Sequence, residues 1–193
     1  YRQNPSPHLP PRSGEGESEG FSSPLRFGEG PGEGLLFLPR WQVLHIALWE
    51  PEIPPNTGNI ARLCAATGAR LHLIGRLGFR LDDKSLKRAG LDYWDAVDVV
   101  RHVTFAEFEA AVAPARVWCV DNPADTPYTR ADFRDGDCLL FGSETKGLPE
   151  GVREKFAGRL LAIPMPTGNV RSLNLATAVG IVLYEALRQT EPW

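Results

Sequence analysis

The chain has 193 residues, a formal net charge of −3 and 23% charged residues. That length suits one domain with a sizeable core, and the near-neutral charge provides no overall attraction to nucleic acid, so RNA binding would need a local basic patch. No apolar run approaches the roughly 18 residues that cross a bilayer. The three cysteines lack CxxC spacing, which favours reduced core thiols over disulfides or metal ligands. We expect a cytoplasmic protein with no membrane or metal partner.

Residues 1–40 differ in composition from the rest of the chain. They contain seven Pro, seven Gly and five Ser, and their only apolar run is 35–38. Pro plus Gly at this level exceeds the roughly 25–30% that is typical of disordered sequence, and so little apolar surface cannot offset the entropy lost on ordering. We expect a disordered extension, part of it not native because the only methionine is Met165, and then one domain over 41–193.

Beyond residue 40, short apolar runs alternate with segments of helical periodicity. This alternation predicts an α/β domain with a largely parallel sheet and helices on both faces. The expected strands span 43–49, 71–74, 97–103, 116–120, 138–141 and 160–163. The expected helices span 60–66, 81–90, 105–112 and the stretch that ends at 189.

A proline-rich turn precedes the first expected helix. Asn56 or Asn59 is the expected N-cap, and Gly68 is the expected C-terminal stop. Arg62 is the only charge in this helix and lies soon after the turn. Taken alone, an exposed helix arginine is the simplest interpretation of Arg62.

Residues 76–88 form the most basic part of the chain, with five basic and two acidic residues. Aromatic residues nearby can stack on bases, which makes this segment a candidate RNA surface. Acidic residues begin the stretch 81–90 and basic ones end it, an order that suits the helix dipole, so a solvated helix face is the alternative. No GxGxxG or P-loop motif stands at a strand–helix junction, which disfavours a dinucleotide or ATP site.

Three loops leave expected strands at the edge where the carboxyl ends meet. They begin at Asp121, Gly142 and Pro164. Ligands of parallel α/β sheets bind outside this edge, and glycines such as Gly142 and Gly147 let the backbone approach a ligand closely. The last loop leads into a C-terminal helix that is apolar on several faces, with Ser172 or Asn174 as the expected N-cap. The sequence therefore predicts a ligand site where the three loops converge.

Three motifs stand in order along the chain: PNTGNIAR at 55–62, LFGSETKGLP at 140–149, and IPM at 163–165 with RSLNL at 171–175. In this order and spacing they resemble the signature motifs of the SPOUT class of RNA 2′-O-methyltransferases. The stretch 44–74 is similar to the minimal TrmL/YibK-type subgroup, which methylates the ribose at the wobble position of tRNA. The third motif departs from the family pattern at Ala176, where serine is usual.

The resemblance implies an α/β SPOUT fold with a C-terminal trefoil knot and S-adenosylmethionine as cofactor. It also implies a homodimer that acts on the tRNA anticodon stem-loop. The positions that match the cofactor pocket of the family are Val120, Gly142, Glu144, Gly147, Ile163, Met165, Ser172 and Leu173.

The catalytic residues that the resemblance implies are Arg62, Glu144, Ser172 and Asn174. A guanidinium does not lose its proton in proteins, so Arg62 is a poor candidate for the base. We expect Arg62, supplied by the partner subunit, to hold the neighbouring phosphate and stabilise the developing alkoxide. Ser172 and Asn174 would then orient the ribose, and the base stays open.

Two further sets of residues complete the predicted site. The candidate RNA contacts are Asn56, Arg62, Arg80, Lys84, Lys87, Arg88 and Arg171. No histidine falls within a motif, so we expect His45, His72 and His102 to be hydrogen-bonded core residues or exposed ones.

Methylation of a wobble cytidine or uridine is the function that the motifs favour. The alternatives are a 2′-O-methyltransferase for ribosomal RNA or another tRNA site, an inactive RNA-binding knot protein, and, with least support, a small-molecule methyltransferase. Ribosomal relatives often carry a folded N-terminal RNA-binding domain, which residues 1–40 cannot form. The intact motif residues disfavour an inactive protein.

Overall fold

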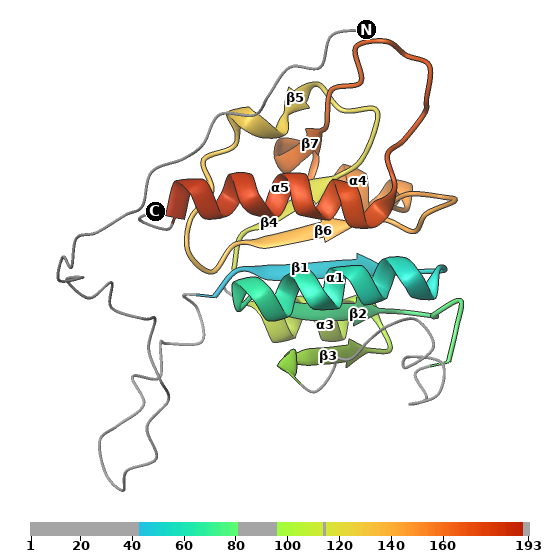
Figure 1. Ribbon diagram of the computed structural model, residues 1–193, viewed down its shortest axis with the longest axis vertical. Helices are drawn as coiled ribbons and strands as arrows, with labels where there is room; N and C mark the ends of the chain where they lie inside the picture. Colours follow the sequence, from blue (N-terminus) through green and yellow to red (C-terminus); the bar gives the residue numbers. More distant parts are fainter. Residues whose placement is uncertain (1–42, 81–95, 114, 191–193) are drawn as a thin grey trace, which may run out of the picture. The chain divides into compact units, whose positions relative to one another are not determined.

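The computed structural model describes residues 43–80, 96–113 and 115–190. Its strands form one sheet in the order β3-β2-β1-β6-β4-β7-β5, and every pairing between them is parallel (Figure 1). The strands are β1 (His45–Trp49), β2 (Arg70–Ile74), β3 (Val99–His102), β4 (Val117–Val120), β5 (Thr126–Pro127), β6 (Cys138–Phe141) and β7 (Leu160–Ala162). The predicted α/β class with a largely parallel sheet is confirmed.

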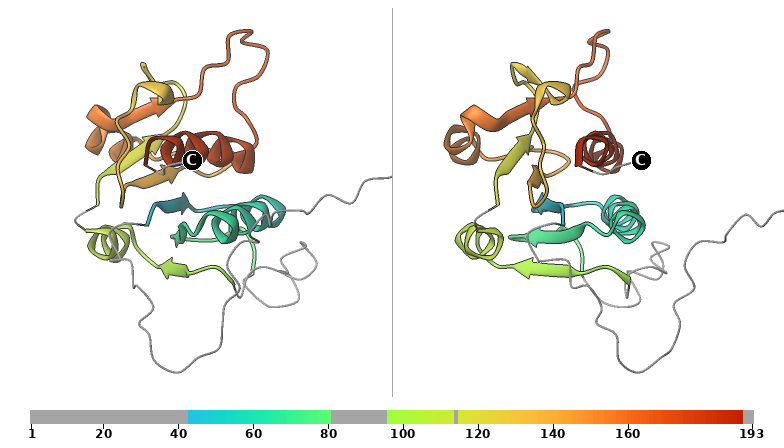
Figure 2. Two further views of the ribbon diagram at one scale, coloured as in Figure 1. Left: turned by 60° about the vertical axis from the view of Figure 1, so that its left-hand side comes forward. Right: turned by 90° about the vertical axis from the view of Figure 1, so that its left-hand side faces the viewer.

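Helices cover both faces of this sheet, as predicted. They are α1 (Pro54–Thr67), α3 (Phe105–Val112), α4 (Glu150–Lys155) and α5 (Leu175–Thr190), with short 3-10 turns η2 (Tyr128–Arg130) and η3 (Ala157–Arg159). Figure 2 shows α1 and α5 on one face and α3 and α4 on the other. The buried apolar residues divide in the same way: Ile60 and Val179 belong to one core, and Phe108 and Val152 to the other. The helix expected at 81–90 lies outside the described residues.

The first helix begins at Pro54, earlier than the sequence predicted. The expected caps at Asn56 and Asn59 are wrong, because both residues lie inside the helix. Prolines fit the first helical turn, where the missing N–H loses no hydrogen bond. Gly68 ends the helix as predicted, with a left-handed φ of 72°.

One strand lies in the loop that begins at Asp121, where the sequence predicted no strand. Thr126 and Pro127 form β5, which pairs with β7 at the end of the sheet. Two residues are too few for a periodicity signal. Proline is also tolerated only at sheet edges, so its presence argued against a strand.

The three cysteines are free, buried thiols, as expected. Burial raises the pKa of Cys64 and of Cys119 to about 12. Thiols with such pKa values stay protonated at neutral pH, so they act as small apolar core residues and not as nucleophiles.

Three buried histidines form a hydrogen-bonded row across strands β1, β2 and β3. His45 Nδ1 lies 2.8 Å from His72 Nε2, and His72 Nδ1 lies 2.9 Å from His102 Nε2. The ring of Phe108 packs against the rings of His72 and His102 in a T-shaped arrangement. Each contact between neutral imidazoles needs one N–H and one bare nitrogen, so the tautomers of the row depend on one another. Of the two predicted alternatives, hydrogen-bonded core residues or exposed ones, the structure shows the first for all three histidines.

We expect acid to destabilise the protein through His102. Burial lowers the pKa of His102 below its usual value, and the negative charge of Glu107 only partly offsets this effect. The unfolded chain then binds a proton more readily than the folded chain. The stability that depends on neutral His102 is therefore fully present above about pH 6.5 and is lost as the pH falls below that value. Urea unfolding between pH 7.5 and pH 5 measures this slope. The variant His102→Gln should show a shallower slope, and an equal slope would contradict the assignment.

Candidate functional site

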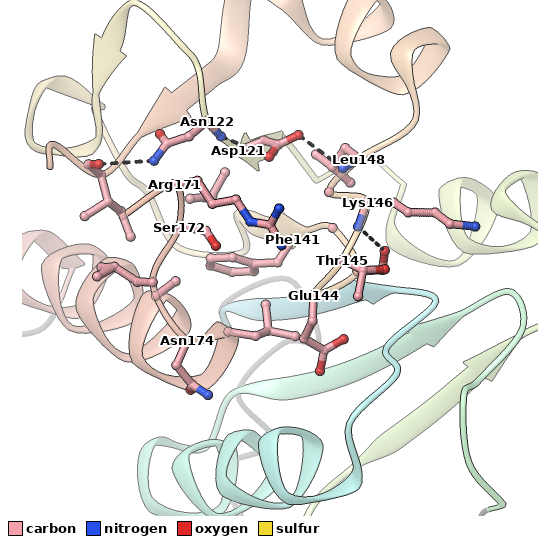
Figure 3. Close-up of a pocket in the computed structure, with 18 of the residues that line it drawn as sticks. Asp121, Asn122, Phe141, Glu144, Thr145, Lys146, Leu148, Arg171, Ser172 and Asn174 are labelled. Carbon is pink, nitrogen blue, oxygen red and sulfur yellow. Dashed lines mark hydrogen bonds between the residues drawn. The ribbon is translucent and has the colours of Figure 1, made fainter. Parts of the chain in front are cut away.

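A cavity of about 810 Å³ opens at the carboxyl ends of β4, β6 and β7 (Figure 3). The loops that follow these strands line it together with the first turns of α1 and α5. The lining residues are Ile53, Asn56, Val120, Asp121, Asn122, Pro123, Phe141, Gly142, Ser143, Glu144, Thr145, Lys146, Gly147, Leu148, Glu150, Arg153, Ile163, Arg171, Ser172, Leu173, Asn174, Leu175 and Ala178. The predicted convergence of the three loops is therefore confirmed.

The structure brings together most of the predicted cofactor residues but not all of them. Those that line the cavity are Val120, Gly142, Glu144, Gly147, Ile163, Ser172 and Leu173. Met165 is not among the lining residues. Its carbonyl accepts a hydrogen bond from the Gly168 N–H at 3.1 Å, which closes a turn in the following loop.

The loop after β6 requires glycine at two positions. A Cβ atom on Gly142 would lie 2.1 Å from the carbonyl carbon of Gly147, and Gly147 has a φ of +68°. Reciprocal backbone hydrogen bonds between Ser143 and Gly147, at 3.2 and 3.0 Å, close the loop on itself. The backbone can fold this tightly only because no side chain stands at position 142. This closed loop forms one wall of the cavity.

An ion pair that the sequence analysis did not identify supports the same loop. Asp121 Oδ2 accepts hydrogen bonds from Arg153 Nη1 at 2.6 Å and from the Leu148 N–H at 3.1 Å. Asp121 directly follows β4, and Arg153 lies in α4. The position of Asp121, an acidic residue at the carboxyl end of a buried strand, could have indicated a functional role. Its partner could not be identified in the same way, because Arg153 is distant in the sequence. This pair ties the loop after β6 to the end of β4.

The predicted polar residues at the helix ends have partners within the protein. Asn174 Oδ1 accepts from the N–H groups of Ala176 and Thr177, so Asn174, and not Ser172, is the N-cap of α5. Asn56 is buried, and its amide bonds both Glu144 and Asn174. Asn56 also lines the cavity, and the contact of Asn56 with RNA stays a prediction.

The predicted basic residues are dispersed. Arg171 and Ser172 are exposed and lie at the cavity (Figure 3). Arg62 is exposed on α1 and is not among the residues that line the cavity. Arg80 is exposed beyond the carboxyl end of β2, at the same edge of the sheet as the cavity. The remaining candidates, Lys84, Lys87 and Arg88, lie outside the described residues.

The lining has the chemistry of a binding pocket for a small polar molecule with an apolar body. Apolar side chains such as Val120, Ile163 and Leu173 alternate with polar groups, and Lys146 and Arg171 place positive charge at the cavity. The volume lies in the range of ordinary ligand sites. No cysteine or histidine is among the lining residues within the described part of the chain. The same described ranges contain no cluster of side chains suited to a metal ion and no helix that could cross a membrane.

Comparison with known proteins gives consistent matches. The SpoU rRNA Methylase family matches residues 43–184. The tRNA (cytidine(34)-2′-O)-methyltransferase of Escherichia coli K12 is 47% identical over 148 residues, which are 76% of this chain and 94% of the relative. The enzyme of the same name from Aeromonas hydrophila is 51% identical over 148 residues, with the same two coverages.

Solved structures agree in fold. One, described as giving structural insights into the 2-OH methylation of C/U34 on tRNA, has a TM-score of 0.72 and 53% identity and covers 77% of this chain and 96% of its own. The SpoU methyltransferase AviRb from Streptomyces viridochromogenes, in complex with the cofactor AdoMet, has a TM-score of 0.66 and 30% identity and covers 79% of this chain and 62% of its own. With the family match over most of the chain, these similarities show that the protein belongs to the SpoU rRNA methylase family.

Proposed function

We propose that this protein transfers a methyl group from S-adenosylmethionine to the ribose 2′-OH of a wobble cytidine or uridine in the tRNA anticodon loop. The observation that carries the proposal is the cavity, because residues of all three sequence motifs line it. Relatives at 47% and 51% identity are named for this reaction at cytidine 34. Anticodon-loop nucleotides are unstacked, which makes them accessible to side chains.

Ribosomal RNA is the second candidate substrate, and the comparisons favour it less. An AdoMet-bound rRNA methyltransferase from Sinorhizobium meliloti is 31% identical, and the match covers 56% of that chain. The wobble enzymes are more similar, and the matches cover nearly their whole length.

The cavity fits S-adenosylmethionine in size and lining. Its apolar walls at Val120, Ile163 and Leu173 suit the adenosine, and the closed glycine loop offers backbone groups without a side chain between them and the ligand. When bound, the cofactor supplies a methyl group activated by its sulfonium. The protein has then to orient the ribose hydroxyl and balance the charge that develops on its oxygen.

We assign these two tasks to residues at the cavity mouth and on α1. Holding two reactants in line can lower the barrier by about 7 kcal/mol or more. Ser172 and Arg171 are exposed at the cavity, and to them we assign contacts with the ribose and its phosphate. Arg62, which stays protonated, would hold the adjacent phosphate and stabilise the forming alkoxide.

We further propose a homodimer in which Arg62 of the partner subunit completes each site. Two observations support it: Arg62 is not among the cavity residues of its own chain, and the α5 residue Tyr184 is a large hydrophobic side chain that is 49% exposed. The proposal includes the trefoil knot of the SPOUT fold, a cytoplasmic location, and assignment of the whole activity to residues 41–193.

The variant Arg62→Ala should lose methyl transfer while keeping cofactor affinity. Removing a group that stabilises developing charge costs on the order of 100- to 1000-fold in kcat. The measurement uses methyl-labelled S-adenosylmethionine and bulk unmodified tRNA, followed by nuclease digestion and mass spectrometry to locate the label. Arg101→Ala, an equivalent change at an exposed arginine of β3, should retain activity. Label at a nucleotide other than the wobble position would contradict the proposed substrate.

Mixed dimers test whether Arg62 acts across the interface. Arg62→Ala and Gly142→Ala chains, carrying different tags and co-expressed, would form a heterodimer with one intact cavity facing one intact Arg62. That heterodimer should recover up to about half of the wild-type activity if arginine comes from the partner subunit. No recovery in a purified heterodimer would place Arg62 in the site of its own chain.

A further inference from the structure

The start of α1 is capped by a carboxylate from a distant loop. Glu144 Oε2 accepts a hydrogen bond from the Glu52 N–H at 2.8 Å, and Glu144 Oε1 accepts from the Ile53 N–H at 3.2 Å. Ile53 precedes the helix, and no side chain of its own segment caps it. A negative charge at a helix N-terminus is favourable because it meets free N–H groups and the positive end of the dipole. Glu144 thus holds the two N–H groups that immediately precede the helix, whose first two residues are prolines without an N–H.

The same carboxylate is linked to the start of α5. Asn56 Nδ2 donates to Glu144 Oε1 at 3.0 Å, and Asn56 Oδ1 accepts from Asn174 Nδ2 at 2.8 Å. Asn174 in turn caps α5 with its own Oδ1. Thr145 adds a parallel link, since its hydroxyl donates to the Glu52 carboxylate at 2.8 Å. One continuous network therefore joins one residue from each of the three sequence motifs.

This arrangement leaves Glu144 little capacity for proton transfer. A carboxylate has about four lone-pair positions, and three protein N–H donors already contact this one. A catalytic base needs an acceptor oxygen that is open to the substrate. The geometry is that of a group that fixes the surrounding loops and helices.

We propose that Glu144 is a positioning residue that acts through Asn56 and the N-terminus of α1. This inference rests on the proposed function. The network forms the wall of the cavity where α1 begins, and Arg62 lies further along the same helix. Because an α-helix moves as a rigid unit, an unfastened N-terminus would displace both the cavity wall and Arg62.

An exchange of chemical groups between the two side chains separates positioning from base catalysis. Glu144→Gln sets an amide N–H against the Glu52 N–H, and Asn56→Asp sets a carboxylate against Glu144. In the double variant E144Q/N56D, the new amide at position 144 can donate to the new carboxylate at position 56, while the amide oxygen accepts from the Glu52 N–H. The longer bond from the Ile53 N–H, which shares its acceptor oxygen with Asn56, is lost. Each single change leaves a group of the network unsatisfied, which corresponds to a loss of about tenfold or more in kcat. The double variant should be more active than either single variant.

The readouts are kcat with bulk unmodified tRNA, the Kd for S-adenosylmethionine by calorimetry, and Tm. Glu154→Gln, the same change at an exposed site of α4, is the matched control. Recovery of kcat in a double variant without a carboxylate at position 144 would establish positioning. The proposal would be overturned if the double variant folds but its kcat falls by the product of the two fold-losses measured for the single variants. If the wild-type protein modifies no tRNA, the proposed function fails. The role of Glu144 is then decided by the Kd for S-adenosylmethionine in the same variants: recovery of affinity in the double variant supports positioning, and no recovery overturns it.

Discussion

Gly142→Ala should weaken S-adenosylmethionine binding by at least about 100-fold, which is about 2.7 kcal/mol. The new Cβ would lie 2.1 Å from the Gly147 carbonyl carbon, 2.5 Å from the Gly147 Cα and 2.4 Å from the Leu148 nitrogen. All three are backbone atoms that cannot turn aside as a flexible side chain could. The closed loop must therefore open, and the cavity wall moves with it. Calorimetric titration with the cofactor measures the loss.

The matched control for this change is Gly151→Ala in α4. A Cβ on Gly151 would meet nothing within 4 Å, and alanine is the better helix former. This variant should bind the cofactor as the wild type does and unfold at an equal or higher temperature. Wild-type affinity in a folded Gly142→Ala protein would show that the loop after β6 does not hold the cofactor.

Asp137→Ala should lower the free energy of unfolding by about 3 kcal/mol, because removing one partner of a buried pair costs roughly 3–5 kcal/mol. Asp137 is 2% exposed and precedes β6. Its carboxylate accepts from Arg116 Nε and Nη2 at 2.8 and 2.7 Å, from the Trp118 indole N–H at 2.9 Å and from the Arg134 N–H at 2.9 Å. The lower end of the range applies because Arg116 is 27% exposed and can regain water.

Urea unfolding at neutral pH measures this change, with Asp132→Ala as the control. Asp132 pairs with Arg134, but its side chain is 70% exposed. Exposed pairs contribute at most about 1 kcal/mol. A similar loss of unfolding free energy in both variants would mean that the contribution of Asp137 to stability does not come from its burial.

The sheet could be predicted because its strands are buried apolar runs. The sequence from Cys138 to Phe141 is apolar throughout, and both faces of β6 are covered. Periodicity does not separate such a run from a buried helix segment, but its short length between helical segments favours a strand. The strand order could not be predicted, since it depends on pairings between residues as distant as His45 and Cys138.

The errors at the site share one physical cause. Local rules placed the cap of α1 at an asparagine, but the N-cap residue is Ile53. Its N–H donates to Glu144, a residue more distant in the sequence than any local rule considers. The ion pair between Asp121 and Arg153 was missed for the same reason. Glycines 142 and 147 were identified correctly because a turn imposes its requirement on the residue itself.

The strand order also determines when each part of the protein can form during synthesis. β1 begins at residue 45, but its neighbour β6 begins at residue 138. The nascent chain can pair β1, β2 and β3 early, and β1 then presents an open edge until most of the chain has left the ribosome. Open edges attract strands of other chains, and such distant pairings form slowly. The refolding yield should therefore fall as protein concentration rises, even though the finished sheet is stable. The reason is that the central pair of strands, β1 and β6, is among the last to form.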